Sequence, residues 1–181
     1  TSLAEALTSA GYNTGYIGKW HIDGTGRSAY IPPERRQGFD YWKVLECTHN
    51  YNKSRYFDRK GQDPRTWEGY DAYAQTRDAV TYIRNHGAAT AENRKPFSLF
   101  LSWGPPHAPY RTGPTKWLEH YDRKKLTLRE NVPAQIRKQA QLTYAGYYAH
   151  CSALDECVGW LMTALRETGQ LENTIVVYTS D

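Results

Sequence analysis

The sequence predicts an α/β fold with a mainly parallel central sheet. Two strongly apolar runs, residues 97–103 and 173–181, have the length and composition of buried strands. Two longer segments, 71–86 and 133–168, have the apolar periodicity of helices. Strand, helix and strand in turn are typical of a parallel sheet whose strands are joined by crossover helices.

The first half of the chain predicts a helix, a strand and a long irregular excursion. Residues 1–10 have helical spacing, and Gly11 ends that helix. A short strand at 12–17 and a polar segment at 18–26 follow. Residues 27–69 have no sustained periodicity and contain several prolines and glycines, so we expect an irregular excursion with a functional role.

The second half predicts the remaining elements. The helix at 71–86 begins near Asp71 and ends at Gly87. The strand at 97–103 runs into a proline-rich turn, because proline cannot continue a ladder. A basic, irregular stretch reaches Asn131, a long helix covers 133–168, and residues 173–181 form the last, central strand.

Composition excludes several classes of protein. The 181 residues are 39% hydrophobic and 23% charged, which fits a folded domain. The sequence contains no run of 18 apolar residues, so we predict no membrane span, and no signal peptide is recognised at its start. The formal net charge of +4 is too mild and too dispersed to indicate nucleic-acid binding. Three cysteines without regular spacing predict neither a disulfide framework nor a zinc ribbon.

Polar side chains follow three of the predicted strands. Lys19 and His21 follow the first, His107 follows the strand at 97–103, and Asp181 ends the last one. Ligands of such sheets sit beyond the carboxyl ends of the strands, so we expect these side chains to share one edge. A cation, two imidazoles and a carboxylate suit an anionic substrate with a metal ion.

Three ordered blocks resemble the sulfatase family. Residues 11–21 (GYNTGYIGKWH) resemble its second signature, and 106–110 (PHAPY) resemble its Pro-His-x-Pro motif. Residues 153–181 (ALDECVGWLMTALRETGQLENTIVVYTSD) resemble its block that ends in Thr-Ser-Asp. Together the blocks span essentially the whole chain.

The resemblance implies a fold, a reaction and roles for four residues. The fold is an α/β/α sandwich like that of alkaline phosphatase. The reaction is hydrolysis of sulfate esters by a formylglycine nucleophile and Ca²⁺. By the resemblance, Lys19 would bind a sulfate oxygen, His21 would hydrogen-bond the formylglycine, His107 would face the bridging ester oxygen, and Asp181 would ligate calcium. Family habit implies a secreted, periplasmic or lysosomal location.

Parts of the family's site are absent from this sequence. The upstream aspartate pair and the formylglycine motif are not found, so the nucleophile is none of these residues. Cys151 begins a partial match, but Asp155 stands where the motif has arginine. Because the chain also opens within a helix and stops on a central strand, we expect 1–181 to be a partial catalytic domain, inactive alone and with calcium absent or weakly bound.

Four further residues are candidates for contacts with the substrate. The resemblance implies that the excursion 27–69 lines the substrate pocket. His49, Asn50 and Tyr51 lie in a polar segment of that excursion, and Tyr110 flanks the His107 turn. A loop that only hydrogen-bonds to itself is an equal alternative for residues 47–52. We expect the substrate to be a sulfated carbohydrate or aryl compound.

Two other functions stay open from sequence. One is a phosphodiesterase or phosphonate hydrolase of the same superfamily, since sulfate and phosphate are alike in size and shape. The other is a pseudoenzyme that binds a sulfated glycan without turnover. We also expect self-association through the exposed edge of the strand at 175–178.

Overall fold

The computed structural model describes residues 1–90, 94–122 and 126–180, and its centre is a five-stranded sheet of order β4-β3-β2-β1-β5. Strand β1 (Asn13–Lys19) pairs in parallel with β2 (Tyr41–Leu45) on one side and with β5 (Phe97–Ser102) on the other. Strands β3 (Arg55–Asp58) and β4 (Arg65–Thr66) add antiparallel pairs beyond β2. The predicted α/β class with a mainly parallel centre is confirmed.

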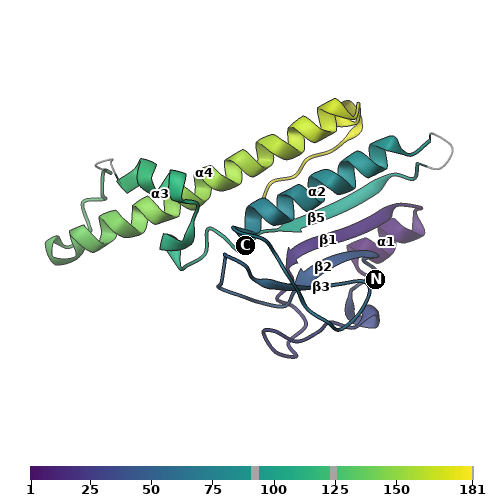
Figure 1. The fold of residues 1–181 in the computed structure, drawn as a ribbon, viewed down its shortest axis with the longest axis horizontal. Helices are drawn as coiled ribbons and strands as arrows, with labels where there is room; N and C mark the ends of the chain where they lie inside the picture. Colours follow the sequence, from purple (N-terminus) through teal and green to yellow (C-terminus); the bar gives the residue numbers. More distant parts are fainter. Residues whose placement is uncertain (91–93, 123–125, 181) are drawn as a thin grey trace.

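Two long helices lie side by side along the sheet (Figure 1). They are α2 (Asp71–Ala88) and α4 (Arg137–Glu167), both close to their predicted bounds. The short helix α1 (Leu3–Ser9) precedes β1, and its first turn is closed by a reciprocal pair of hydrogen bonds between Ser2 and Glu5. Helix α3 (Thr115–Asp122) packs against α4.

Each face of the sheet buries its own apolar cluster. On the face under α2, Ile17 packs with Leu99 and Leu101 against Ala74 and Ala79. The opposite face is covered by the chain that follows β1, in a cluster made of Tyr16, Trp20, Ile31, Phe39, Trp42 and Val44. With both faces covered, β1 has the composition expected of a central parallel strand.

The structure differs from the sequence predictions in three segments. The excursion 27–69 is not wholly irregular, because β2, β3 and β4 lie within it. Helix α3 lies within the stretch predicted to be irregular up to residue 131. Residues 174–180 form no strand, although the sequence predicts one across 173–181. A strand needs a partner, and none of the described residues pairs with this segment.

Candidate anion-binding site

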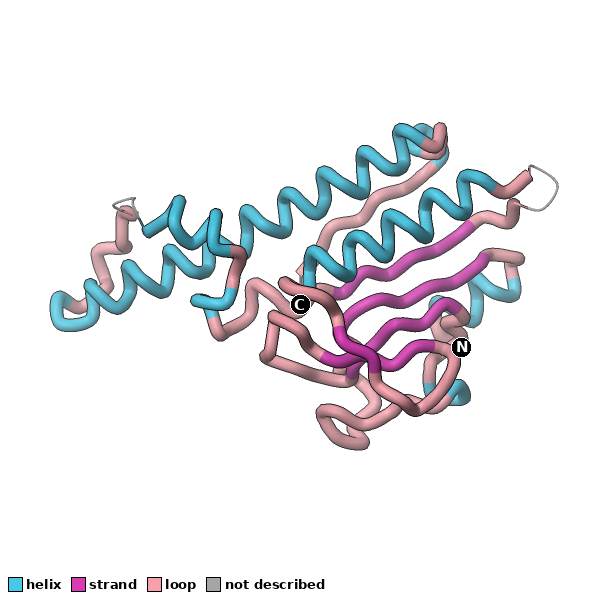
Figure 2. Tube along the Cα trace, in the orientation of Figure 1, coloured by secondary structure: helices cyan, strands magenta, loops and turns pink. Residues whose placement is uncertain are grey.

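The register of the sheet brings three separate parts of the chain to one edge. Lys19 lies opposite Leu45 of β2, and Gly18 lies opposite Ser102 of β5. The three parallel strands therefore end together, and the loops that follow them gather near the same end (Figure 2). This is the edge on which the sequence predicts a site.

Gly18 makes the junction between β1 and β5 possible. Its φ of +112° lies in the region that favours glycine. A Cβ atom there would lie 2.0 Å from the carbonyl oxygen of Ser102. Since that obstacle is backbone, only a residue without a side chain fits beside β5, and Lys19 follows at the strand end.

The segment after Lys19 is fixed by the end of β2. The backbone N–H of His21 donates to the carbonyl oxygen of Glu46 at 2.8 Å. The Oε1 atom of Glu46, a buried side chain, accepts from the N–H groups of Asp23 and Gly24 at 3.0 Å each. His21 itself is exposed and has a φ of 57°. These contacts hold a backbone conformation that non-glycine residues adopt at a cost.

His49 and His107 meet in space although 58 positions separate them in the chain. Their rings stack with centroids 4.5 Å apart at an angle of 27°. Both side chains are exposed, so a ligand can reach them. The predicted substrate residue His49 thus lies directly beside the predicted catalytic residue His107.

The surroundings of His49 are positively charged. The pKa of His49 is lowered from its ordinary value. The largest cause is loss of hydration, and smaller contributions come from the charges of Arg27, His107, Lys19 and His21. A histidine surrounded by cations favours its neutral form. These five side chains form what we call the basic cluster, and an anion is the ligand that it suits.

Arg27 belongs to this cluster and was not singled out by sequence reasoning. One guanidinium nitrogen, Nη2, lies 3.2 Å from Nδ1 of His49 and 3.7 Å from the sulfur of Cys47. The Arg27 carbonyl accepts from the N–H of Cys47 at 2.9 Å. No motif marks Arg27, and only the pairing of two distant loop segments places it here.

The loop that carries His107 is supported from below. The hydroxyl of Tyr51 donates to the carbonyl oxygen of Ala108 at 3.1 Å, and Tyr51 is only 2% exposed. Behind Tyr51, the Nδ1 atom of the buried His150 ring lies 2.7 Å from the hydroxyl oxygen of Tyr70. The sequence predicts Tyr51 beside the substrate, but the structure places it beneath the loop, where it supports His107.

The other two predicted contact residues lie at the rim. Asn50 is exposed, and its side-chain oxygen accepts from the N–H of Asn52 at 3.1 Å, so part of this segment does hydrogen-bond to itself. Tyr110 is half-buried and packs edge-to-face on Tyr147, with ring centroids 6.0 Å apart. Whether either side chain touches a substrate stays a prediction.

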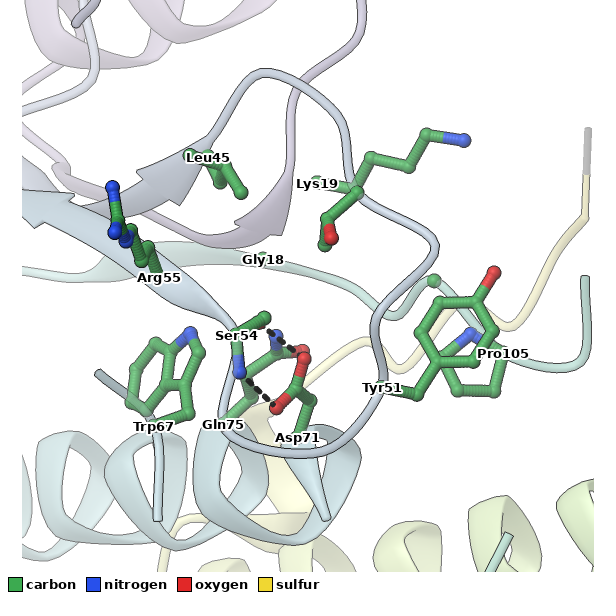
Figure 3. A pocket seen from close by; sticks show the side chains of 12 residues that line it. Gly18, Lys19, Leu45, Tyr51, Ser54, Arg55, Trp67, Asp71, Gln75 and Pro105 are labelled. Carbon is green, nitrogen blue, oxygen red and sulfur yellow. Dashed lines mark hydrogen bonds between the residues drawn. The ribbon is translucent and has the colours of Figure 1, made fainter. Parts of the chain in front are cut away.

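A small cavity lies beneath the Lys19 backbone (Figure 3). Its volume is about 20 Å³, which suits a water molecule and no substrate. On its floor, Asp71 accepts hydrogen bonds from the N–H and the hydroxyl of Ser54, while burial raises the Asp71 pKa. The Lys19 side chain leads away from this cavity, so a ligand of Lys19 would lie outside it.

A metal site is not formed within the described part of the chain. There, no group of three or more His, Cys, Asp and Glu side chains is placed to hold a metal ion. Asp181, the predicted calcium ligand, lies outside the described residues.

The same described part contains no helix long and apolar enough to cross a membrane.

Comparison with known proteins gives a consistent result. The Sulfatase family model matches residues 1–181. The ulvan-active sulfatase of Formosa agariphila is 43% identical over 179 residues, which cover 99% of this chain and 34% of that relative. The chain thus spans about a third of that relative's length.

Two solved structures share the fold. The sulfatase yidJ from Bacteroides fragilis superposes with a TM-score of 0.83 at 26% identity, over 94% of this chain and 41% of that chain. A protein in complex with its substrate, D-glucosamine-2-N,6-O-disulfate, superposes with a TM-score of 0.63 at 19% identity. That match covers 96% of this chain and 48% of the other chain.

Proposed function

Because the chain belongs to the sulfatase family, we propose that its basic cluster binds the sulfate group of an ester and assists its hydrolysis within the complete protein. The observation that carries the proposal is the meeting of Lys19, His21, His49 and His107 at the carboxyl ends of β1 and β5. Positive charge at a preformed edge binds the anionic sulfate group and stabilises the charge that develops on the leaving oxygen in the transition state.

The side chains of this chain divide the proposed work by their chemistry. Lys19 carries a permanent charge and binds a sulfate oxygen. His107 has Nδ1 within 2.8 Å of the carbonyl oxygen of Ala108, so that nitrogen holds a proton and donates. Its other nitrogen, Nε2, is the atom that gives a proton to the bridging ester oxygen as the leaving group departs. His21, by family resemblance, hydrogen-bonds a hydroxyl of the formylglycine and takes its proton as sulfate is expelled.

The nucleophile and the metal are proposals that rest on family membership. We place the formylglycine nucleophile outside residues 1–181 and propose Asp181 as a calcium ligand. No group of three or more His, Cys, Asp and Glu side chains among the described residues is placed to hold the ion, so we propose that its other ligands come from outside them. Bound calcium supplies a further positive charge for a sulfate oxygen. If dialysis against a chelator leaves turnover by the complete protein unchanged, the calcium assignment fails.

The substrate we propose is a sulfated carbohydrate. A relative is named for activity on ulvan, and a structural neighbour holds a disulfated glucosamine as its substrate. In this chain, the half-buried ring of Tyr110 lies three residues from His107, and an aromatic face of this kind stacks on sugar rings. A secreted, periplasmic or lysosomal location remains a proposal, which fractionation of the source cells checks.

The direct test is release of inorganic sulfate by the purified complete protein. We expect turnover of sulfated mono- and oligosaccharides, weaker turnover of 4-nitrophenyl sulfate, and none by residues 1–181 alone. Preferred hydrolysis of the matching phosphate esters would favour the phosphoesterase alternative. Binding of a sulfated sugar with no release of sulfate would favour the pseudoenzyme.

A further inference from the structure

The two stacked histidines hold their protons on different atoms. Nδ1 of His107 faces the carbonyl oxygen of Ala108, which only accepts, so the ring proton of neutral His107 sits on Nδ1. Nδ1 of His49 faces Nη2 of Arg27, and a guanidinium only donates. His49 therefore accepts at Nδ1, and its ring proton sits on Nε2.

Arg27 also excludes the charged form of His49. A protonated ring would turn an N–H toward the N–H of the guanidinium, and the hydrogen bond at 3.2 Å would be lost. The charged and titratable groups around His49 all lower its pKa. Loss of hydration is the largest cause, followed by the charges of Arg27, His107, Lys19 and His21. The same Arg27 nitrogen also contacts the sulfur of Cys47.

Because the two rings stack, the protonation state of His49 affects that of His107. With ring centroids 4.5 Å apart, two imidazolium ions would repel each other strongly. A neutral His49 leaves one of the two rings to carry a positive charge, and His107 is the ring with a nitrogen suited to proton exchange. The pair thus offers one fixed hydrogen-bond donor beside one general acid.

We propose that Arg27 is a positioning residue that holds His49 as a neutral donor, whose Nε2–H binds a substrate oxygen beside the proton-transferring nitrogen of His107. This role of Arg27 rests on the proposed function, since it concerns the same site. Arg27 touches no reacting atom and acts through His49. The backbone of Arg27 is held by the loop after β2, where its carbonyl accepts from the N–H of Cys47.

Nuclear magnetic resonance of the complete protein with ¹⁵N-labelled histidine tests the geometry without turnover. At neutral pH we expect Nδ1 of His49 to be unprotonated and Nε2 to be protonated. In Arg27→Met the two tautomers mix and the pKa of His49 rises, because a neighbouring positive charge is removed. Arg27→Lys keeps the charge, so the pKa stays low while the tautomer mixes. In Arg59→Met, which removes an exposed arginine paired with Asp40, the His49 signals should stay as in the wild type.

Kinetics separate the positioning role from a purely structural one. With a sulfated sugar that the wild type cleaves, Arg27→Met should lower kcat/KM about tenfold, the loss of one well-placed hydrogen bond. The acidic limb of its pH profile should move to higher pH, and Arg27→Lys should recover part of the loss.

The two proposals fail in different ways. A wild-type protein that releases no sulfate from any sulfated sugar contradicts the proposed function. An active protein with a proton on Nδ1 of His49, or with unchanged kcat/KM and pH profile in Arg27→Met, contradicts the role of Arg27.

Discussion

Lys19 is the residue on which binding of the sulfate group should depend most. It is the last residue of β1, it pairs with Leu45 of β2, and its side chain leads away from the small cavity beneath it. A charge held in place before the reaction costs little reorganisation when charge develops on the substrate.

Replacement of Lys19 by Met in the complete protein should lower kcat/KM roughly 10²- to 10³-fold, as loss of one transition-state donor does. Sulfate release measured over a range of sulfated-sugar concentrations checks this. Lys60→Met is the matched control, because Lys60 is an exposed residue that follows β3 at the other end of the sheet. Equal losses in both variants would contradict a specific role for Lys19.

Gly18 should be intolerant of any side chain. Gly18→Ala places a Cβ against the backbone of Ser102 at a positive φ, so we expect the free energy of unfolding to fall by more than about 1 kcal/mol. Denaturant unfolding of the complete protein measures the change. In Gly61→Ala the new Cβ meets nothing within 4 Å, and stability should change by less than about 0.5 kcal/mol. A Gly18→Ala protein as stable as this control would contradict the close approach of β1 and β5.

At the scale of elements, the loop after β5 depends on α4. His150 of α4 is fully buried, and its Nε2 lies 3.4 Å from the Pro109 carbonyl oxygen. Burial lowers its pKa, an effect partly opposed by that backbone contact. The burial of His150 beneath the His107 loop therefore favours a neutral ring.

This burial predicts a dependence of stability on pH. The unfolded His150 takes up a proton near its ordinary pKa of about 6.5, whereas the folded ring does so only at lower pH. Its contribution to stability is thus present above about pH 6.5 and is lost as the pH falls toward the lowered folded value. Unfolding of the complete protein followed between neutral and mildly acidic pH should show the loss.

Two variants isolate this contribution. His150→Gln cannot titrate, so its stability should fall less steeply over the same pH range, although it starts lower. His120→Gln removes an exposed histidine of α3 and should keep the wild-type slope. If the slope of His150→Gln matches that of the wild type, His150 is not the group responsible.

The elements that sequence predicts well are those with long patterns. Helices α2 and α4 show several turns of apolar periodicity, and β5 is an apolar run between prolines. Strands β2, β3 and β4 are five, four and two residues long, too short for a pattern to stand out among prolines and glycines. The run at 174–180 has strand composition, yet composition supplies no pairing partner.

The same limit applies to the site. Motif resemblance marks Lys19, His21 and His107, because each lies in a recognisable block. Arg27, and the stacking of the predicted residue His49 on His107, enter through contacts between loops, which depend on how the excursion folds back over the strand ends. Burial of Tyr51 depends likewise on the loop that covers it.

At the scale of the whole molecule, one side of the sheet carries a risk of association. Strand β5 ends the sheet order, so among the described residues only β1 pairs with it. The unpaired segment 174–180 follows α4 in the chain. Its side chains Ile175 and Val177 are 93% and 78% exposed. Unpaired backbone and exposed apolar side chains favour contact between copies of a chain.

We therefore expect the isolated chain 1–181 to self-associate as its concentration rises. Sedimentation velocity over a wide range of concentrations measures this. A variant with Ile175→Lys and Val177→Lys should shift the onset to higher concentration, since it adds two like charges to the segment. A wild-type chain that stays monomeric throughout would contradict the prediction.

The pairing of β1 with both β2 and β5 has a consequence for the order of folding. The contact between Gly18 and Ser102 closes a loop of more than eighty residues, and contacts so distant in sequence form late. The end of β5, which leads into the His107 loop, lies beside the end of β1 only after that closure. The proposed affinity for anions would thus be one of the last properties that a nascent chain acquires, and inorganic sulfate should slow unfolding without accelerating the early collapse.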